Sequence, residues 1–308
     1  MIFHIHGGSF KIKLIDAYRR LALKYSRAAG GAAVFSVDYR TMPEYIFPSQ
    51  LDDVMSAWDM LTAKGIKSEN IVVLGDSSGA NLVLALAQKL RDSGRPMPKK
   101  LICFSLWGDM TACGESYERN CHSDPFYGIA KKEKFKDHEA YFRRRPKYAG
   151  EHDLLDPYLS VSFADFSGFP PTAFFCGTAE VGESDSDTAF ANALSAGVDA
   201  KLYKYDGLFH DFQLLSFLPE SKDVFRKLES ILKKKLPNLF TGSAVLLIFY
   251  ASSFASASSC ALFSSVIAER IVTVPICSIS LLFSNIFAIF LAAVGAHEPF
   301  SINATVRF

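Results

Sequence analysis

The stretch IVVLGDSSGAN, residues 71–81, joins a short apolar run to a G-x-S-x-G motif. The apolar run Ile71–Leu74 predicts a buried strand, and the residues that follow the motif predict a helix. Between them, Gly75 and Gly79 allow the backbone to turn sharply without a clash at Cβ, which is the setting of a nucleophile elbow. The pattern therefore predicts that Ser77 is held in a strained conformation with its hydroxyl exposed, ready to act as a nucleophile.

On both sides of this elbow, short apolar runs alternate with amphipathic stretches as far as about residue 236. Strands that alternate with helices are typical of a mainly parallel sheet covered by helices on both faces, so the sequence predicts an α/β fold. The expected strands are Ile2–His6, Ala33–Val37, Ile71–Leu74, Leu101–Leu106, Thr172–Cys176 and Ala200–Tyr205. The expected helices are Ile15–Ala29, Pro48–Lys64, Ala80–Ser93, Ser186–Ala196 and Ser221–Leu236.

Residues 107–168 interrupt this alternation. The segment is rich in Tyr, Phe, Arg, Lys and Pro. Long insertions in α/β folds tend to lie on the functional face, so we expect a lid over the mouth of the sheet. The alternative is an excursion through solvent that has no role at the site.

A second motif, HGGSF at residues 6–10, directly follows the first predicted strand. Consecutive glycines expose backbone N–H groups, and such donors bind the oxyanion of a tetrahedral intermediate. We expect Gly7 and Gly8 to form an oxyanion hole with the N–H of Ser78, while His6 braces the loop and transfers no proton. An ordinary Gly-Gly turn is the alternative, and the presence of both motifs in this order disfavours it.

A third loop, YDGLFHDF at residues 205–212, follows the last predicted strand and carries His210. A histidine at this position can reach Ser77 across the top of the sheet and accept its proton. We therefore predict that His210 is the base.

The base needs an acid to orient it, and the chain order serine, acid, histidine places that acid between Ser77 and His210. The loop after the fifth predicted strand holds three candidates. Glu180 lies nearest the strand end and is the expected acid, and Asp185 is the fallback. Glu183 is expected to face water or to cap the helix that follows.

The composition excludes several classes of function. A net charge of +1 and the absence of a basic stripe argue against binding to nucleic acid. The six cysteines contain no CxxC pair, so a zinc site is not expected. Free thiols are favoured over a disulfide between Cys113 and Cys121. The amino terminus lacks the features of a signal peptide.

Residues 238–308 differ in composition from a hydrolase domain expected over residues 1–237. They are largely apolar with many serines, and the spans 243–266 and 271–294 are each long enough to cross a bilayer. Three lysines at 233–235 precede them, so the positive-inside rule predicts a membrane hairpin with the catalytic domain in the cytosol. The alternatives are a buried or interfacial first span, or a tail that arises from an incorrect gene model, which would leave a cytoplasmic protein.

The motifs together resemble the hormone-sensitive-lipase family of α/β-hydrolases, which includes the bacterial family IV esterases. The resemblance extends from Ile2 to about Leu236. Its motifs are HGGSF at 6–10, VDYRxxPE at 37–44, FP at 47–48, Asp52, GDSSGAN at 75–81, DPYLS at 156–160, PPT at 170–172, GTAE at 177–180 and YDGLFH at 205–210.

This resemblance implies an eight-stranded sheet, no metal or organic cofactor, and acyl esters of small molecules or lipids as substrates. Family members carry a segment before the first of these strands, so we expect an N-terminally truncated domain with an exposed sheet edge. Many members have aspartate where Glu180 stands. The implied site comprises the triad Ser77, Glu180 and His210, the oxyanion donors Gly7, Gly8 and Ser78, and the supporting residues His6, Gly75, Asp76 and Gly79.

The sequence thus predicts a carboxylic ester hydrolase that works through an acyl-enzyme on Ser77. A non-catalytic ligand-binding protein on the same fold is one alternative, which the presence of His210 disfavours. An inactive truncated family member is another. The same site could also catalyse acyl transfer or elimination.

Overall fold

A computed structural model describes residues 1–129, 144–232 and 247–251. Chain contacts divide the protein into two units, residues 1–271 and 272–308, and every described residue belongs to the first. The predicted membrane spans 243–266 and 271–294 lie outside the described residues, apart from 247–251. Among the residues that are described, no helix is both long and apolar enough to cross a membrane.

The predicted parallel sheet is present, and all six expected strands form within two residues of their predicted ends. Adjacent strands are parallel throughout, and their order is β6-β5-β4-β3-β1-β2-β7. The strands are β1 (Ile2–Ile5), β2 (Val34–Asp38), β3 (Val72–Asp76), β4 (Lys100–Phe104), β5 (Thr172–Gly177), β6 (Ala200–Tyr205) and β7 (Leu247–Ala251).

The edge of β2 is paired, because β7 runs beside β2 along its whole length, from Val34 opposite Leu247 to Asp38 opposite Ala251. This strand falls inside the first predicted membrane span. The described part of the sheet has seven strands, one fewer than the resemblance implies.

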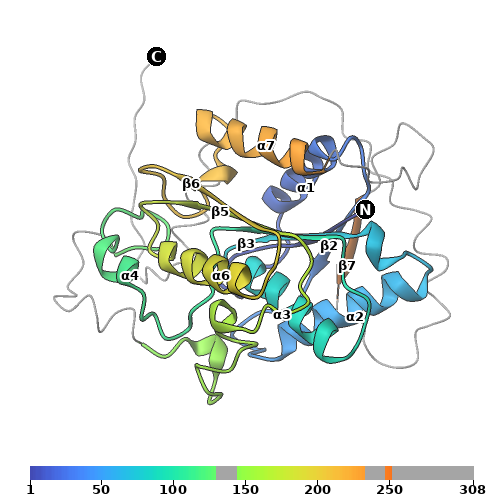
Figure 1. Cartoon of the computed structure of the whole chain (residues 1–308), viewed down its shortest axis with the longest axis horizontal. Helices are drawn as coiled ribbons and strands as arrows, with labels where there is room; N and C mark the ends of the chain where they lie inside the picture. Colours follow the sequence, from blue (N-terminus) through green and yellow to red (C-terminus); the bar gives the residue numbers. More distant parts are fainter. Residues whose placement is uncertain (130–143, 233–246, 252–308) are drawn as a thin grey trace. The chain divides into compact units, whose positions relative to one another are not determined.

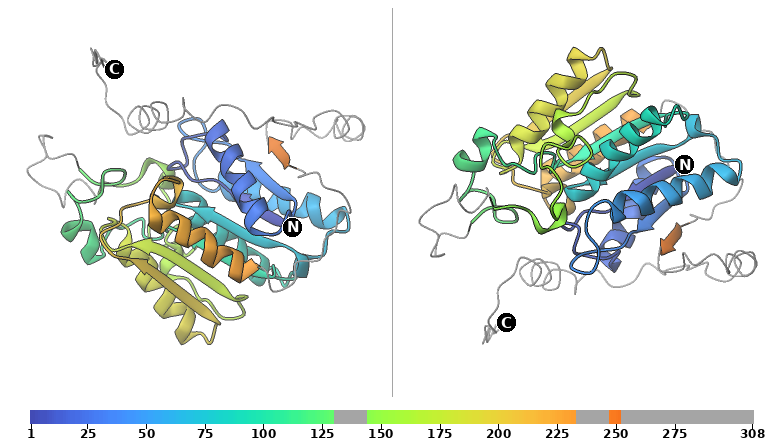
Figure 2. Two further views of the ribbon diagram at one scale, coloured as in Figure 1. Left: turned by 90° about the horizontal axis from the view of Figure 1, so that it is seen from above. Right: turned by 90° about the horizontal axis from the view of Figure 1, so that it is seen from below.

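Helices cover both faces of the sheet, as predicted. Helices α1 and α7 lie on one face, and α2, α3 and α6 lie on the other (Figure 1). Figure 2 shows the first pair over the strands from above and the other three from below. The helices are α1 (Asp16–Ala28), α2 (Ser49–Ala63), α3 (Ser78–Asp92), α4 (Glu115–Arg119), α6 (Glu183–Ser195) and α7 (Pro219–Leu232), with 3-10 turns at Ser68–Asn70, Lys147–Ala149, Val161–Phe163 and Phe212–Leu214.

Helix α6 begins three residues earlier than the sequence predicts. Its first turn contains the acidic residues Glu183 and Asp185. Negative side chains are stabilised at the amino end of a helix by the exposed N–H groups and the helix dipole. These acids therefore extend the helix back toward the end of β5.

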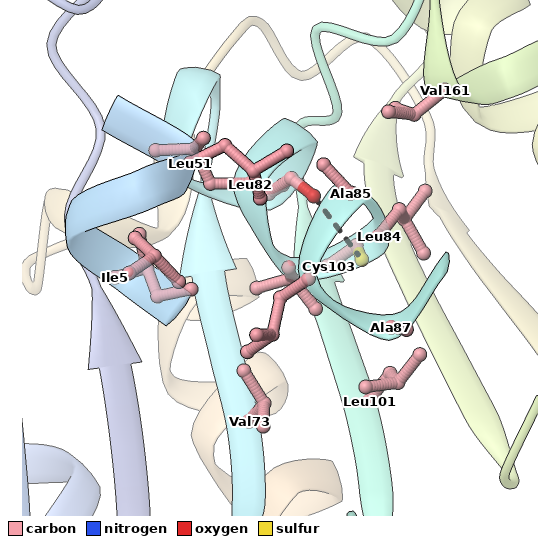
Figure 3. Packing of buried hydrophobic residues seen from close by; sticks show 14 of the residues in the cluster. Ile5, Leu51, Val73, Leu82, Leu84, Ala85, Ala87, Leu101, Cys103 and Val161 are labelled. Atoms are coloured by element: carbon pink, nitrogen blue, oxygen red, sulfur yellow. Dashed lines mark hydrogen bonds between the residues drawn. The ribbon is translucent and has the colours of Figure 1, made fainter. Parts of the chain in front are cut away.

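Two apolar layers separate the sheet from its helices. Along β3, Val73 packs into the layer under α2, α3 and α6, while Val72 and Leu74 pack under α1 and α7. This alternation follows from the two-residue period of a strand. Figure 3 shows residues of the first layer, among them Val73 of β3 and Leu82 of α3, and the Sγ of Cys103 lies 3.9 Å from the carbonyl oxygen of Ala80.

Candidate active site

The carboxyl ends of β3, β5 and β6 bring three distant loops together, and the first of these loops carries Ser77. This residue joins β3 to α3 and has φ 52° and ψ −122°. A non-glycine residue with such dihedral angles is strained, at a cost of about 1–3 kcal/mol. The strain is maintained because β3 and residues Ser78–Gln88 of α3 are buried on either side of the turn.

The two glycines of the motif are required by close packing against the end of β1. A Cβ at Gly75 would lie 2.6 Å from the carbonyl oxygen of Ile5, and one at Gly79 would lie 2.2 Å from the same atom. Both distances are far below a van der Waals contact. The elbow can therefore form only if positions 75 and 79, which lie against the end of β1, carry no side chain.

His210 lies against Ser77 although 133 residues separate them. The distance from His210 Nε2 to Ser77 Oγ is 2.9 Å, which is within hydrogen-bonding range. Both side chains are nearly buried, with 5% and 6% of their residue surfaces exposed. An imidazole nitrogen is thus in place to take the proton of the serine hydroxyl.

Glu180 faces the other ring nitrogen of His210. Its Oε2 lies 3.6 Å from His210 Nδ1, just beyond hydrogen-bonding distance. Its Oε1 accepts hydrogen bonds from the N–H of Gly177 and the hydroxyl of Ser105, each at 2.7 Å. Burial raises the pKa of Glu180, and His210, Gly177 and Ser105 act in the opposite direction. The carboxyl group is therefore fixed through one oxygen and presents the other to the imidazole.

Ser105 is a site residue that the sequence analysis missed. It follows β4 with φ 45°, and its side chain is fully buried. Its hydroxyl donates to Glu180 and accepts the N–H of Asp211 at 2.9 Å. A polar residue just after an apolar strand was the available signal, because the carboxyl ends of parallel strands meet at one edge of the sheet.

Asp185, the fallback acid, is bound elsewhere. Its Oδ2 accepts the N–H groups of Gly108 at 2.8 Å and Asp109 at 3.0 Å, and the hydroxyl of Tyr117 at 3.0 Å. These donors belong to the inserted segment, so Asp185 holds that segment to α6.

The expectation that Glu183 faces water is wrong. Only 5% of its side chain is exposed, and it forms ion pairs with Lys204 at 2.7 Å and with Arg119. A carboxylate at this depth requires such partners. Glu183 thus links α4, α6 and β6.

The glycine loop after β1 is fixed by contacts on both sides. His6 Nδ1 lies 2.8 Å from the carbonyl oxygen of Gly7, and the His6 ring stacks on Tyr39 with 4.3 Å between centroids. Burial lowers the pKa of His6 to about 4, so the ring is neutral at ordinary pH. The hydroxyl of Tyr39 donates to the carbonyl oxygen of His6 at 2.7 Å.

One expected oxyanion donor is already engaged. The N–H of Gly7 donates to Asp76 Oδ2 at 3.2 Å, so this group is not free to bind an oxyanion. Within the described residues, the N–H groups of Gly8 and Ser78 donate no hydrogen bond. This bond separates Gly7 from the other two expected donors, Gly8 and Ser78, and the oxyanion role of all three residues stays a prediction.

The inserted segment reaches the site through aromatic side chains. The ring of Tyr127 lies 5.1 Å from that of His210, and Trp107 lies 5.7 Å from Tyr127. Phe10 of the glycine loop contacts Trp107 at 5.5 Å and stacks on Tyr148 at 3.5 Å. Tyr127 of this segment therefore packs against His210, and the role of the segment as a lid stays a prediction. Residues 130–143 of the predicted lid lie outside the described part.

Comparison of the sequence with known proteins identifies relatives that are hydrolases, in agreement with the geometry of the site. A family model described as the alpha/beta hydrolase fold matches residues 2–214. An acetyl-hydrolase of Streptomyces hygroscopicus is 31% identical over 209 residues, which span 68% of this chain and 67% of that protein. An esterase of Acinetobacter venetianus is 32% identical over 223 residues, or 72% of this chain and 71% of that protein.

Solved structures show the same likeness. The crystal structure of an esterase from the bacterial hormone-sensitive lipase family has a TM-score of 0.69 and 32% identity, with 77% of each chain covered. From the family match over more than half its length and from these relatives, we conclude that the chain belongs to the α/β-hydrolase family, among its hormone-sensitive-lipase-like esterases.

Proposed function

We propose that this protein is a serine carboxylic ester hydrolase in which Ser77, His210 and Glu180 form the catalytic triad. The observation that carries the proposal is the 2.9 Å contact between His210 Nε2 and the strained Ser77. Relatives named as esterases and an acetyl-hydrolase support acyl esters as the substrate class. Small-molecule and lipid esters both fall within that class.

In the acylation step, Ser77 Oγ attacks the ester carbonyl while its proton passes to His210 Nε2. Glu180 stabilises the imidazolium that forms. When the tetrahedral intermediate collapses, the C–O bond to the alcohol breaks and the alcohol leaves with the proton from Nε2. Water then attacks the acyl-enzyme by the same route and releases the acid.

The negative charge on the carbonyl oxygen needs donors that are not already engaged. We assign this role to the N–H groups of Gly8 and Ser78. Each such donor typically contributes about 3 kcal/mol to transition-state stabilisation. Gly7 acts indirectly, because its bond to Asp76 fixes the loop from which Gly8 projects.

The test is labelling with a fluorophosphonate probe, together with a chain-length panel of p-nitrophenyl esters. We expect labelling and turnover in the intact protein, and loss of both in Ser77→Ala. Ser93→Ala, at the far end of α3, is the matched control and should behave like the wild type. A well-folded wild type that neither labels nor turns over would contradict the proposal and favour a ligand-binding protein.

A further inference from the structure

A second carboxylate approaches His210 from the side of Ser77. Asp211 Oδ2 lies 3.6 Å from His210 Nε2, the same nitrogen that faces the serine hydroxyl. The imidazole thus has a carboxylate near each ring nitrogen, with Glu180 at Nδ1 and Asp211 at Nε2. Only 1% of Asp211 is exposed, so solvent screens this charge very little.

The position of Asp211 is held by contacts that do not involve Oδ2. The residue has φ 56° and ψ 26°, in the left-handed region. Its N–H donates to Ser105 Oγ at 2.9 Å, and its Oδ1 accepts from Gln213 Nε2 at 3.0 Å. Of these two bonds only the one from Gln213 uses the carboxylate, through Oδ1, and Oδ2 lies 3.6 Å from the imidazole.

Asp211 shares this buried region with a second carboxyl group. Asp76 is a neighbouring buried carboxyl group whose Oδ1 has no hydrogen-bond partner among the described residues. Burial and the charge of Asp211 raise the pKa of Asp76 well above its ordinary value, whereas His210 and the N–H of Gly7 act in the opposite direction. Burial also raises the pKa of Asp211, but the His210 imidazolium opposes this effect.

We propose that Asp211 is a positioning residue that keeps a negative charge beside His210 Nε2 and thereby sets the pH range in which His210 can act as a base. This inference rests on the proposed function of His210. Because the negative charge of Asp211 favours the imidazolium, His210 loses its proton, and becomes able to act as a base, only at a higher pH than it would without this charge. The same charge stabilises the imidazolium that forms when Ser77 is deprotonated.

The electrostatic balance at His210 agrees with this role. Burial lowers the pKa of His210, but the charge of Asp211, followed by the contact with Glu180, raises it overall above the ordinary value of an imidazole. The titratable groups that face the ring are Asp76 after β3, Asp124 and Tyr127 in the inserted segment, Glu180 after β5, and Asp211.

The test compares Asp211→Asn and Asp211→Gly with the wild type. Asn preserves the acceptor for Gln213 and removes the charge, and Gly also relieves the positive φ, so at least one variant is expected to fold. Asp206→Asn is the control, because this exposed residue of the same loop contacts Thr178 and not His210.

Two readouts are needed. The first is the NMR titration of His210 in the unreacted protein, which requires no turnover, with the His210 signal assigned by its loss in His210→Asn. The second is the pH profile of kcat/KM for a p-nitrophenyl ester. In both Asp211 variants we expect the His210 titration and the acid limb of the profile to move to lower pH by about one to three units. The plateau at high pH should be lower than in the wild type, because the imidazolium has lost a stabilising charge.

Unchanged titration of His210 in both variants would overturn the inference, as would a titration that moves while the acid limb of activity stays in place. A loss of activity at all pH values without a shift would indicate a structural role and would also overturn it. A wild type that hydrolyses no ester but whose His210 titration shifts as expected would instead refute the proposed function and leave the electrostatic effect of Asp211 established.

Discussion

Two carboxylates five residues apart, Glu180 and Asp185, follow the same strand. The exposed fraction of each residue is 2% or less. Glu180 is anchored through one oxygen and turns the other toward His210. Asp185 receives three donors on one oxygen, and all three come from the inserted segment. Both groups are equally deep, so burial alone does not distinguish a catalytic acid from a structural one.

The difference lies in the partners. The free oxygen of Glu180 faces the ring of His210, which can gain or lose a proton. Asp185 instead faces backbone amides and a tyrosine hydroxyl, and these donors keep their protons. A carboxylate opposite a titratable ring can respond to a charge that develops during a reaction. A carboxylate opposite fixed donors can only hold them in place.

The largest effect is expected for Glu180→Gln. The amide oxygen would keep the bonds to Gly177 and Ser105, so the NH₂ group would face His210 Nδ1. A donor there forces the tautomer that carries its proton on Nε2, which cannot accept the proton of Ser77. We expect kcat to fall by about 10³- to 10⁴-fold, as measured with a p-nitrophenyl ester, while the unfolding midpoint stays close to that of the wild type.

Asp185→Asn is the comparison that could reverse this assignment. The amide oxygen can accept the same three donors, so we expect activity within an order of magnitude of the wild type. If Asp185→Asn abolished turnover while Glu180→Gln did not, the acid would be assigned to the wrong residue.

The second effect concerns stability. Asp185→Ala removes the acceptor of two amides and one hydroxyl, and it should lower the free energy of unfolding by about 3 kcal/mol, as measured by urea denaturation. Asp187→Ala, on the same helix but with a half-exposed side chain that pairs with Lys204 at 2.9 Å, is the matched control and should change stability by no more than about 1 kcal/mol. Equal losses in the two variants would show that the three bonds to Asp185 contribute nothing specific.

Ser105→Ala should give a smaller effect on activity. It removes one hydrogen bond to Glu180 and leaves the N–H of Asp211 without its acceptor. We expect kcat/KM to fall by about tenfold, which corresponds to the loss of one hydrogen bond to a charged group.

Ser36→Ala provides the control for Ser105→Ala. Ser36 is, like Ser105, a buried serine, but it lies within β2 and its hydroxyl is 2.9 Å from His4 Nδ1. The Ser36→Ala variant should be less stable than the wild type but should keep its activity. A similar drop in activity in both variants would argue against a role of Ser105 at the site.

The smallest effect is expected for Glu183→Gln. Glu183 is as deeply buried as the other two acids and lies between them in sequence, but it pairs with Lys204 and Arg119. Its partners are half-exposed, so the change should cost only about 1 kcal/mol of stability and leave kcat nearly unchanged. A large loss of activity would extend the catalytic region beyond Glu180.

The strands, most helix positions and the order of the three loops were predictable from the sequence, because apolar periodicity and glycine placement act over short distances. The G-x-S-x-G motif between Leu74 and Ala80 is of this kind. So is the position of His210, since it lies in a loop directly after a strand. The pairing of β7 with β2 was not predictable, because it depends on strand edges brought together from distant parts of the chain. The early start of α6 was missed although the acids of its first turn are a local signal.

The sequence by itself determined which residues could supply a hydroxyl, an imidazole and a carboxylate at one edge of a parallel sheet. Only the tertiary structure decided which oxygen faces which nitrogen: Glu180 rather than Asp185 at Nδ1, Asp211 beside Nε2, and Asp76 on the amide of Gly7. The physical reason is that a hydrogen bond depends on distances of a few tenths of an ångström. Such distances are set by the packing of whole strands and helices and leave no pattern in the local sequence.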